Sequence, residues 1–254
     1  MGLDPRLTVI EERFSRVRRV IAVASSKGGV GKTLISATLA LAAAEKGLRP
    51  GLLDIDLTNP TAHIVLGVDT EAVKPEEEKG VVPPEVHGVR FMTVAFYSGE
   101  NPLPLRGSEI DEAFKEILAI TRWGELDVLF IDTPPGISNE ILDLLSYIPR
   151  VETLVVTTPS PLAIRSTIRL VKMLRDADED VVGAVVNMVG RGVADAKRLL
   201  RELGMEILGE IPMDPEVDGV LGDPNRLLRT RFGKAVANVL TRFAFTSSET
   251  LRRR

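Results

Sequence analysis

A run of small and charged residues near the N-terminus has the composition of a phosphate-binding loop. Residues 25–33 read Ser-Ser-Lys-Gly-Gly-Val-Gly-Lys-Thr, between an apolar stretch, Val20 to Ala24, and a helical pattern, Leu34 to Glu45. Backbone N–H groups of a glycine-rich turn and of a helix N-terminus converge on anionic oxygens. We therefore expect Lys32 to bind the β- and γ-phosphates of a nucleotide and the Thr33 hydroxyl to bind Mg²⁺.

A second lysine, Lys27, precedes Lys32 and has no task in an ordinary phosphate loop. It lies too early to meet phosphates held by its own chain, so we expect it to serve the nucleotide of a neighbouring subunit. The motif Lys-Gly-Gly-x-Gly-Lys-Thr resembles that of the deviant Walker ATPases of the MinD, ParA and Mrp group. In that family the early lysine crosses a dimer interface. The resemblance therefore implies a homodimer that forms with ATP, in which Lys27 and Lys32 are both catalytic.

Two residues depart from the pattern of this family. Ser26 replaces the first glycine of the strict motif, and Leu34 stands where a second hydroxyl often contacts the α-phosphate. Neither departure removes the charge or the metal ligand of the loop. We expect the nucleotide phosphates to be bound by one continuous stretch, which consists of Gly28, Gly29, Val30, Gly31, Lys32, Thr33 and Leu34.

Two aspartates alternate at the end of the second apolar run, Gly51 to Ile55. Alternation along a strand aims Asp54 and Asp56 in the same direction, at the carboxyl edge of an open α/β sheet, where ligands bind. Two carboxylates beside a phosphate loop are suited to handle Mg²⁺ and water. The family resemblance assigns Asp56 to positioning the attacking water and Asp54 to the neighbourhood of the metal, and it identifies this segment as switch I.

A third aspartate follows the apolar run from Val128 to Ile131. The run would carry Asp132 to the edge that holds the phosphate loop, where a carboxylate can hold Mg²⁺ through water. We identify Asp132 as the Walker B acid, which completes an expected metal site together with Thr33 and Asp54. The residues that follow, Pro134-Pro135-Gly136, resemble switch II of the Mrp branch.

The base is expected to be adenine. GTPases of the common type read guanine with Asn-Lys-x-Asp, and the sequence after Asn187 lacks that aspartate. The family recognises adenine with an asparagine at this strand end and with a proline-rich loop after the next strand. The resemblance thus implies that Asn187 and the loop residues Pro212, Met213 and Asp214 bind ATP or ADP.

Apolar strand-like runs alternate with helical patterns along the chain, in the order typical of a parallel sheet covered on both faces. We predict a single-domain α/β fold with a doubly wound, mostly parallel sheet, as in P-loop NTPases. The expected strands span 20–24, 51–55, 89–94, 128–131, 153–157, 181–187 and 207–211. The expected helices include 34–45, 110–120, 140–146, 163–176, 193–203 and 233–243.

We divide the chain into an N-terminal amphipathic helix over residues 1–18, a P-loop ATPase domain over 19–245 and a flexible tail over 246–254. The first helix either packs on the domain or docks a partner protein. An acid- and proline-rich stretch over 70–85 predicts an irregular, mobile loop. The helix over 233–243 is expected to cover the sheet and not to bind a membrane, since the arginine-rich tail after it is too polar to insert.

Composition narrows the classes of protein. The 254 residues carry a net charge of −4, which argues against an obligatory nucleic-acid partner. No apolar run approaches the roughly 20 residues that span a bilayer, and the N-terminus lacks an apolar signal core, so we expect a cytoplasmic protein. The sequence has no cysteine, which excludes disulfides and thiolate-ligated metals within it.

These features predict a Mg²⁺-dependent ATPase that acts as a dimerisation switch. Residues 123–127, the double proline and residues 208–215 look most like the Mrp branch, whose members commonly carry iron–sulfur clusters on a C-terminal Cys-x-x-Cys. A chain without cysteine resembles instead the archaeal ATPases that assist nickel insertion into hydrogenase with a separate metallochaperone. We expect that role and that partner, with spatial positioning or partition, or iron–sulfur cluster assembly, as alternatives.

The two histidines, His63 and His87, lack a shared local spacing that would suggest a metal pair. A solvent-exposed or hydrogen-bonded side chain is the expectation for each. His63 follows switch I and is the better candidate for contact with a metal cargo.

Overall fold

An eight-stranded sheet forms the centre of the molecule. The structure is a computed structural model that describes residues 4–98, 105–190 and 192–243. The strand order is β10-β9-β8-β1-β7-β2-β6-β5, and all neighbouring pairs are parallel except β5 with β6. The strands are β1 (Val20–Ala24), β2 (Pro50–Asp54), β5 (Glu85–Val86), β6 (Val89–Thr93), β7 (Val128–Asp132), β8 (Val151–Thr157), β9 (Asp180–Val189) and β10 (Ile207–Pro212).

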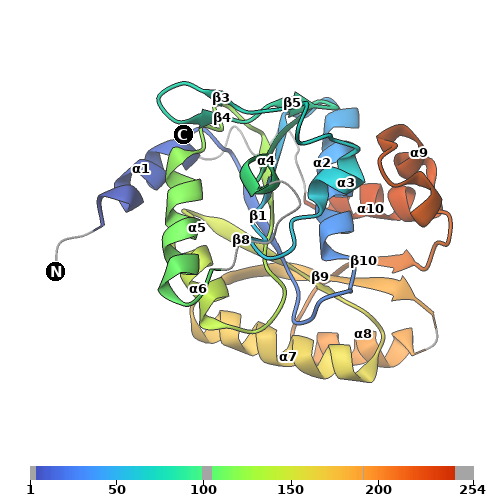
Figure 1. Cartoon of the computed structure of the whole chain (residues 1–254). Coiled ribbons are helices and arrows are strands. Elements are labelled where there is room, and N and C mark those ends of the chain that lie inside the picture. The colour runs from blue at the N-terminus through green and yellow to red at the C-terminus, as the bar shows by residue number, and fades with distance from the viewer. Residues whose placement is uncertain (1–3, 99–104, 191, 244–254) are drawn as a thin grey trace, which may run out of the picture.

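Helices cover both faces of this sheet (Figure 1). One face is covered by α2 and α10, which pack on each other, together with α3 and α9. The other face carries α5, α6, α7 and α8. The helix bounds are α1 (Pro5–Phe14), α2 (Lys32–Glu45), α3 (Ala62–Leu66), α4 (Ala95–Ser98), α5 (Ser108–Ile120), α6 (Asn139–Ser146), α7 (Pro161–Asp176), α8 (Val193–Glu202), the 3₁₀ helix η1 (Asp218–Val220), α9 (Pro224–Arg229) and α10 (Arg231–Arg242). The predicted doubly wound α/β fold is confirmed.

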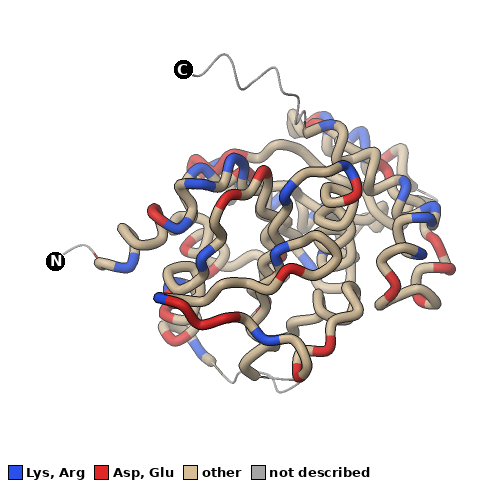
Figure 2. The backbone as a smooth tube through the Cα atoms, turned by 90° about the horizontal axis from the view of Figure 1, so that it is seen from above, with Lys and Arg blue, Asp and Glu red and all other residues tan. Residues whose placement is uncertain are grey.

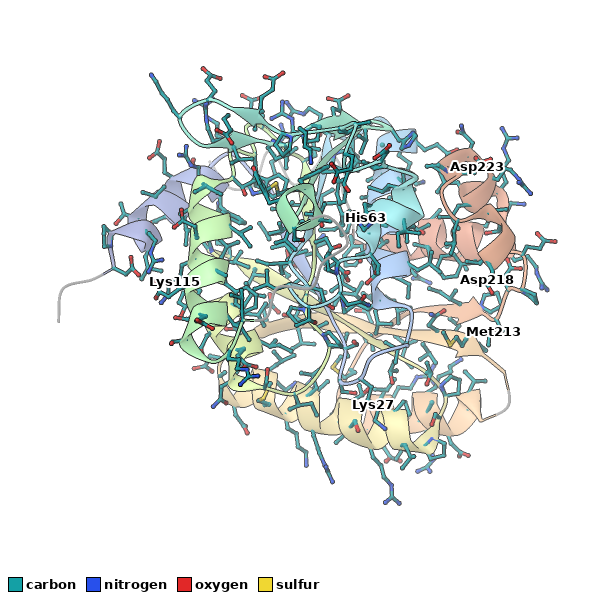
Figure 3. All side chains as sticks on the ribbon, in the orientation of Figure 1. Lys27, His63, Lys115, Met213, Asp218 and Asp223 are labelled. Carbon is teal, nitrogen blue, oxygen red and sulfur yellow. The ribbon has the colours of Figure 1, made fainter. Side chains whose placement is uncertain are left out.

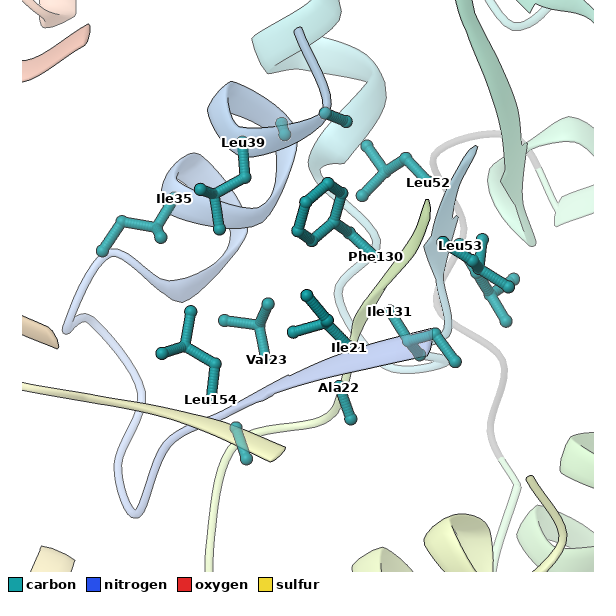
Figure 4. Packing of buried hydrophobic residues seen from close by; sticks show 14 of the residues in the cluster. Ile21, Ala22, Val23, Ile35, Leu39, Leu52, Leu53, Phe130, Ile131 and Leu154 are labelled. Carbon is teal, nitrogen blue, oxygen red and sulfur yellow. The ribbon is translucent and has the colours of Figure 1, made fainter. Parts of the chain in front are cut away.

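The central strands are apolar on both sides because each is buried between two layers of helices. Every residue of β1, β2 and β7 is buried. Figure 4 shows Leu39 of α2 beside Phe130 of β7, with Ile35 on the turn of the helix before it. This packing fixes α2 on the sheet, and with α2 it fixes the loop that connects β1 to that helix.

The segment over 70–85 differs from the mobile loop that its composition predicts. It contains an antiparallel hairpin of β3 (Glu76–Glu77) and β4 (Val81–Val82). Val81 is buried, and its carbonyl accepts a hydrogen bond from the Arg122 backbone N–H. The hairpin is therefore held by tertiary contacts that polar composition does not reveal.

The two terminal helices pack on the domain. α1 packs against α5, with Ile10 and Phe14 fully buried, which favours packing on the domain, one of the two roles left open for the helix over 1–18. α10 packs against α2 and β10, so this helix covers the sheet as predicted. The tail over 246–254 lies outside the described residues.

No helix within the described ranges is both long and apolar enough to cross a membrane. Basic and acidic residues are interspersed along the backbone in Figure 2.

Candidate nucleotide-binding site

The phosphate loop and two aspartates meet at the carboxyl edge of the sheet. The loop follows β1, and Asp132, the last residue of β7, pairs with Val23 on one side and with Asp54 of β2 on the other. Ligands of open α/β sheets bind at this edge. The strands therefore bring together the loop and the acids that the sequence predicts to share a site.

A cavity of about 410 Å³ opens above the loop. Three segments line it, namely the phosphate loop, the chain from Asp56 to α3, and the region around η1. The lining includes Lys27, Gly28, Gly29, Val30, Gly31, Lys32, Thr33 and Leu34, together with Asp56, Asn59, Thr61, Ile64, Val65, Pro135, Val217, Asp218 and Leu221. All the loop residues expected to bind phosphates lie on the cavity, whereas Ile64, Val217, Asp218 and Leu221 carry no motif that could have identified them.

The glycines of the loop have different surroundings. A Cβ placed on Gly28 or Gly29 would have no heavy atom within 4 Å, so the backbone there is open to a ligand. Gly31 has φ +84°, and a Cβ on it would lie 2.4 Å from Asn187 Nδ2. Only glycine satisfies both the conformation and the close approach at this position.

Lys32 makes a buried ion pair with the Walker B acid. Its Nζ lies 2.6 Å from Asp132 Oδ1, and the side chains are 6 % and 0 % exposed. The Ser36 hydroxyl lies 3.0 Å from the same oxygen and 2.9 Å from the Lys32 carbonyl, and it can donate its one proton to either. Asp132 Oδ2 is buried with no hydrogen-bond partner among the described residues. The negative charge at Oδ1 is thus balanced by the Lys32 ammonium group, whereas Oδ2 has an unused capacity to accept a hydrogen bond or to bind a metal ion.

Ser36 was not among the predicted site residues. It lies four residues after Lys32 on α2, which places both side chains on one face of the helix. Its Oγ is a donor within reach of Asp132 because β7 packs on that face. The i, i+4 spacing from the lysine was the available signal.

Asp54 is fully buried beside Asp132. Its Oδ1 accepts from the Asp56 backbone N–H at 3.2 Å, and its Oδ2 accepts from the Ala62 backbone N–H at 3.0 Å. Burial, followed by the charge of Asp132, raises the pKa of Asp54 to about 8. Asp54 therefore lies next to Asp132, the expected Walker B acid, and both of its carboxylate oxygens accept backbone hydrogen bonds from the segment that follows β2.

Asp56 lies on the cavity with one oxygen free for water. Its Oδ1 accepts from the backbone N–H groups of Thr58 and Asn59 and from the Thr58 hydroxyl, at 3.2, 3.1 and 2.8 Å. These bonds hold the carboxylate in one orientation. All three of these hydrogen bonds end on Oδ1, and no donor to Oδ2 is found among the described residues.

The base-binding residues expected from the sequence lie at the ends of two neighbouring strands, since Pro212 of β10 pairs with Val189 of β9, two residues after Asn187. Asn187 is buried and donates from Nδ2 to the Val30 carbonyl over 2.8 Å, so it lies against the phosphate loop. Met213 follows the end of β10 and is 60 % exposed, and Figure 3 shows it at the edge of the molecule, below Asp218. Neither Asn187 nor the loop residues Pro212, Met213 and Asp214 line the cavity above the phosphate loop.

Asp214 belongs to the start of α10 in this structure. Its Oδ2 accepts from the Phe232 backbone N–H at 3.0 Å, and its Oδ1 accepts from Glu216 N–H at 3.3 Å. The pKa of Asp214 lies below its usual value of 3.8, mainly because its carboxylate accepts the hydrogen bond from the Phe232 backbone N–H. The carboxylate joins the loop to the helix, a contact across the chain that the motif does not indicate.

Lys27 is exposed, and no hydrogen bond or ion pair of its ammonium group is found within the described part of the chain. Figure 3 places it on the side of the molecule where α7 runs. It also lines a second, more open cavity of about 460 Å³ with Thr158, Ser160 and Leu162 at the start of α7. The side chain is thus available to a partner molecule.

The histidines do not form a metal site. His87 Nε2 lies 3.0 Å from the Leu66 carbonyl, so this side chain is hydrogen-bonded as expected. His63 lies on α3, half-buried. Among the described residues, no three His, Cys, Asp or Glu side chains are grouped so as to hold a metal ion.

Known proteins resemble the chain over most of its length. The family described as ParA, NUBPL iron-transfer P-loop NTPase, matches residues 16–244. An iron–sulfur cluster carrier protein of Pseudomonas fragi is 35 % identical over 219 residues, which are 80 % of this chain and 76 % of that relative. A protein of the same name from Pyrococcus horikoshii is 32 % identical over 84 % of this chain and 80 % of its own length. The chain spans only 59 % of the carrier protein of Aquifex aeolicus, to which it is 33 % identical.

Solved structures share the fold. A nucleotide-binding protein of Archaeoglobus fulgidus in complex with ADP has a TM-score of 0.72 and 27 % identity, and the match covers 88 % of this chain and 93 % of that one. The cell division ATPase MinD of Pyrococcus furiosus has a TM-score of 0.67 and 22 % identity, over 89 % and 98 % of the two chains. From the extent of the family match and from these identities, the chain belongs to the ParA/MinD/Mrp family of P-loop NTPases, in its Mrp/MinD-like branch.

Proposed function

We propose that the chain hydrolyses ATP with Mg²⁺, and that the nucleotide controls an association of two copies that serves iron–sulfur cluster transfer. The observation that carries the hydrolysis is the cavity at the sheet edge. An open glycine backbone, Lys32 and the carboxylate of Asp56 line this cavity, and the fully buried Asp132 lies behind it in an ion pair with Lys32.

The residues present suit the phosphates of a nucleotide. The open backbone at Gly28 and Gly29 and the N-terminus of α2 supply N–H donors, which bind anions well. Lys32 is held by Asp132 in this structure. When phosphates arrive, they offer its ammonium group a second set of negative charges, so Lys32 can move from a carboxylate to the β- and γ-phosphate oxygens.

The same residues suit a magnesium ion. Asp132 Oδ2 is a buried acceptor without a partner in the described residues, and Thr33 lies on the cavity. Oxygen ligands of this kind are those that Mg²⁺ prefers. Thr33 and Asp132 would hold the ion, which supplies charge neutralisation at the phosphate oxygens when bound.

Asp56 is the residue that we propose to orient the attacking water. Its Oδ1 is fixed by three donors of switch I, which leaves Oδ2 as a preorganised acceptor on the cavity. Positioning of this type contributes to phosphoryl transfer without covalent chemistry. Lys27 would stabilise charge on the phosphates of a second copy, since it is exposed at the mouth of the loop.

Adenine is the base that we propose for this site. Asn187 donates one amide N–H to the Val30 carbonyl, and this hydrogen bond fixes the orientation of its Oδ1, which is an acceptor. An acceptor attracts the exocyclic amino group of adenine and repels the O6 carbonyl of guanine. The ADP complex of the Archaeoglobus fulgidus protein supports the same choice.

The relatives support the iron–sulfur alternative better than nickel insertion, which the sequence alone favours. Proteins more than 30 % identical to the chain from three organisms are named iron–sulfur cluster carriers. This sequence contains no cysteine, and thiolates are the usual ligands of such clusters. We therefore propose that the cluster is held by thiolates of a partner protein and that this chain supplies the nucleotide-driven step. Likeness to MinD supports only the fold, at 22 % identity.

Two measurements test this proposal. Phosphate release from Mg–ATP should be detectable with the wild-type chain and should be lost in the Asp132→Ala variant. Transfer of a cluster from a loaded scaffold protein to an apo-ferredoxin, followed anaerobically by absorbance, should be faster with the chain and ATP than with the chain and ADP. Equal transfer with both nucleotides, or tight stoichiometric binding of nickel by the chain, would count against it.

A further inference from the structure

Ser26 provides a hydroxyl directly before Lys27, where the strict family motif has glycine. Its Oγ lies 3.3 Å from the hydroxyl of Thr167 on α7. Thr167 is fully buried and donates in turn to the Thr157 hydroxyl at 2.9 Å. A serine at this position therefore connects the phosphate loop to α7 and to the end of β8, a connection that glycine cannot make.

The direction of the hydrogen bonds follows from the number of protons. A threonine hydroxyl has one proton, and Thr167 gives its proton to Thr157. Ser26 must then be the donor to Thr167, and Thr157 donates weakly to the Thr158 carbonyl at 3.5 Å. Hydroxyls that all point in one direction polarise each other and strengthen the chain. Removal of the middle hydroxyl would release Ser26.

Hydrogen bonds also fix the backbone of the two residues next to Ser26, Ser25 and Lys27. Ser25 donates from its hydroxyl to the Lys27 carbonyl at 3.0 Å, and the Ser25 carbonyl accepts from the Gly136 backbone N–H at 2.9 Å. The Lys27 ammonium group, by contrast, contacts no partner among the residues that the structure describes. The chain thus holds the backbone before Lys27 and leaves its side chain free.

We propose that Ser26 and Thr167 are positioning residues that hold the loop in the conformation from which Lys27 reaches the second copy. The inference rests on the proposed function, specifically on ATP-linked association through Lys27. A loop that is already ordered loses less conformational entropy when two copies meet. Since Thr167 does not line the nucleotide cavity, its hydroxyl should matter for association and not for the affinity of a single chain for nucleotide.

The decisive variant is Thr167→Val, which removes the hydroxyl and nearly keeps the shape. Association measured by sedimentation velocity with a non-hydrolysable ATP analogue and Mg²⁺ should weaken about tenfold, because a hydrogen bond contributes on the order of a few-fold and each dimer contains two loops. Nucleotide affinity measured by calorimetry on dilute protein should stay within about twofold. Thr167→Ser, which keeps the hydroxyl, should restore association, and Ser26→Gly should weaken it as Thr167→Val does.

Thr153→Val is the matched control. Thr153 is buried in β8, and its Oγ1 has no hydrogen-bond partner in the described part of the chain. The same chemical change there should leave association as in the wild type. Lys27→Ala tests the role of Lys27 in association separately from the role of the Ser26–Thr167 hydrogen bond. If Lys27→Ala associates like the wild type, the proposed role of Lys27 fails and this inference falls with it. If Lys27→Ala is monomeric while Thr167→Val and Ser26→Gly associate normally, the inference alone is overturned.

Discussion

At the scale of single residues, the pair of Lys32 and Asp132 decides the stability of the nucleotide-free site. Both side chains are buried and lie 2.6 Å apart. Removal of one partner of a buried ion pair leaves an uncompensated charge in a poorly solvating place, which costs about 3–5 kcal/mol. Replacement of both partners by neutral residues of similar size is far less costly.

We therefore expect Lys32→Met to destabilise the nucleotide-free protein by about 3–5 kcal/mol. The double variant Lys32→Met/Asp132→Asn should recover most of that loss, because no buried charge of the pair then remains. Urea unfolding followed by circular dichroism measures both. If the loss in the free energy of unfolding of the double variant equals the sum of the losses of the two single variants, the two side chains are not coupled.

Base selectivity is a second prediction at this scale. Mg–ATP should bind at least about tenfold more tightly than Mg–GTP, since one favourable hydrogen bond at Asn187 is replaced by two facing acceptors. Asn187→Asp should reduce the affinity for ATP, because a carboxylate would face the Val30 carbonyl that now receives an amide proton. Calorimetric titration with both nucleotides is the measurement. Equal affinities for ATP and GTP would remove Asn187 from base recognition.

At the scale of elements, apolar runs and periodicity predicted the seven parallel strands and the main helices between them, because the central strands β1, β2 and β7 are buried on both faces. The hairpin β3–β4 could not be predicted, since its two-residue strands are too short for a periodic signal and are held by Arg122 from a distant segment. In the site, too, some residues could be predicted from sequence motifs and others depend on contacts that only the fold creates. The loop and the acids Asp56 and Asp132 could be found by motif, whereas the contacts of Asp54 and Asp214 depend on which backbone N–H groups the fold brings near.

Asp214 shows how one such contact responds to pH. Its pKa is lowered in the folded protein, so its contribution to stability is present above the ordinary value of 3.8 and is lost as the pH falls through the folded value. Asp214→Asn should lower the melting temperature at pH 7. The difference from the wild type should shrink below about pH 4, where the carboxylate becomes protonated.

Thermal melts from pH 3 to pH 7 would measure this dependence. Asp176→Asn is the control, because Asp176 is exposed at the end of α7 and no hydrogen bond of its side chain occurs within the described ranges. A melting difference for Asp214→Asn that stays constant across the range would show that the charge of Asp214 is not what stabilises the start of α10.

At the scale of the whole molecule, the cavity is lined by parts of the two segments that the family resemblance identifies as switch I and switch II. Switch I is fastened by Asp54 and carries Asp56, and switch II is joined to the phosphate loop through Gly136 N–H and the Ser25 carbonyl. Asp56 of the first segment and Pro135 of the second both line the cavity above the phosphate loop. Gain and loss of the γ-phosphate can therefore shift the population of a form that associates.

The variant Asp56→Ala tests whether hydrolysis resets this switch. Nucleotide binding rests on the glycine backbone and Lys32, which the substitution leaves in place, so the variant should still bind ATP. Without the oriented carboxylate, hydrolysis should fall by about 100-fold or more, on the scale of a lost positioning group. The ATP-bound dimer should then persist in size-exclusion chromatography, whereas the wild type should return to smaller species as ATP is consumed. A variant that hydrolyses ATP at the wild-type rate would exclude Asp56 from the mechanism, and one that binds ATP but never dimerises would separate hydrolysis from association.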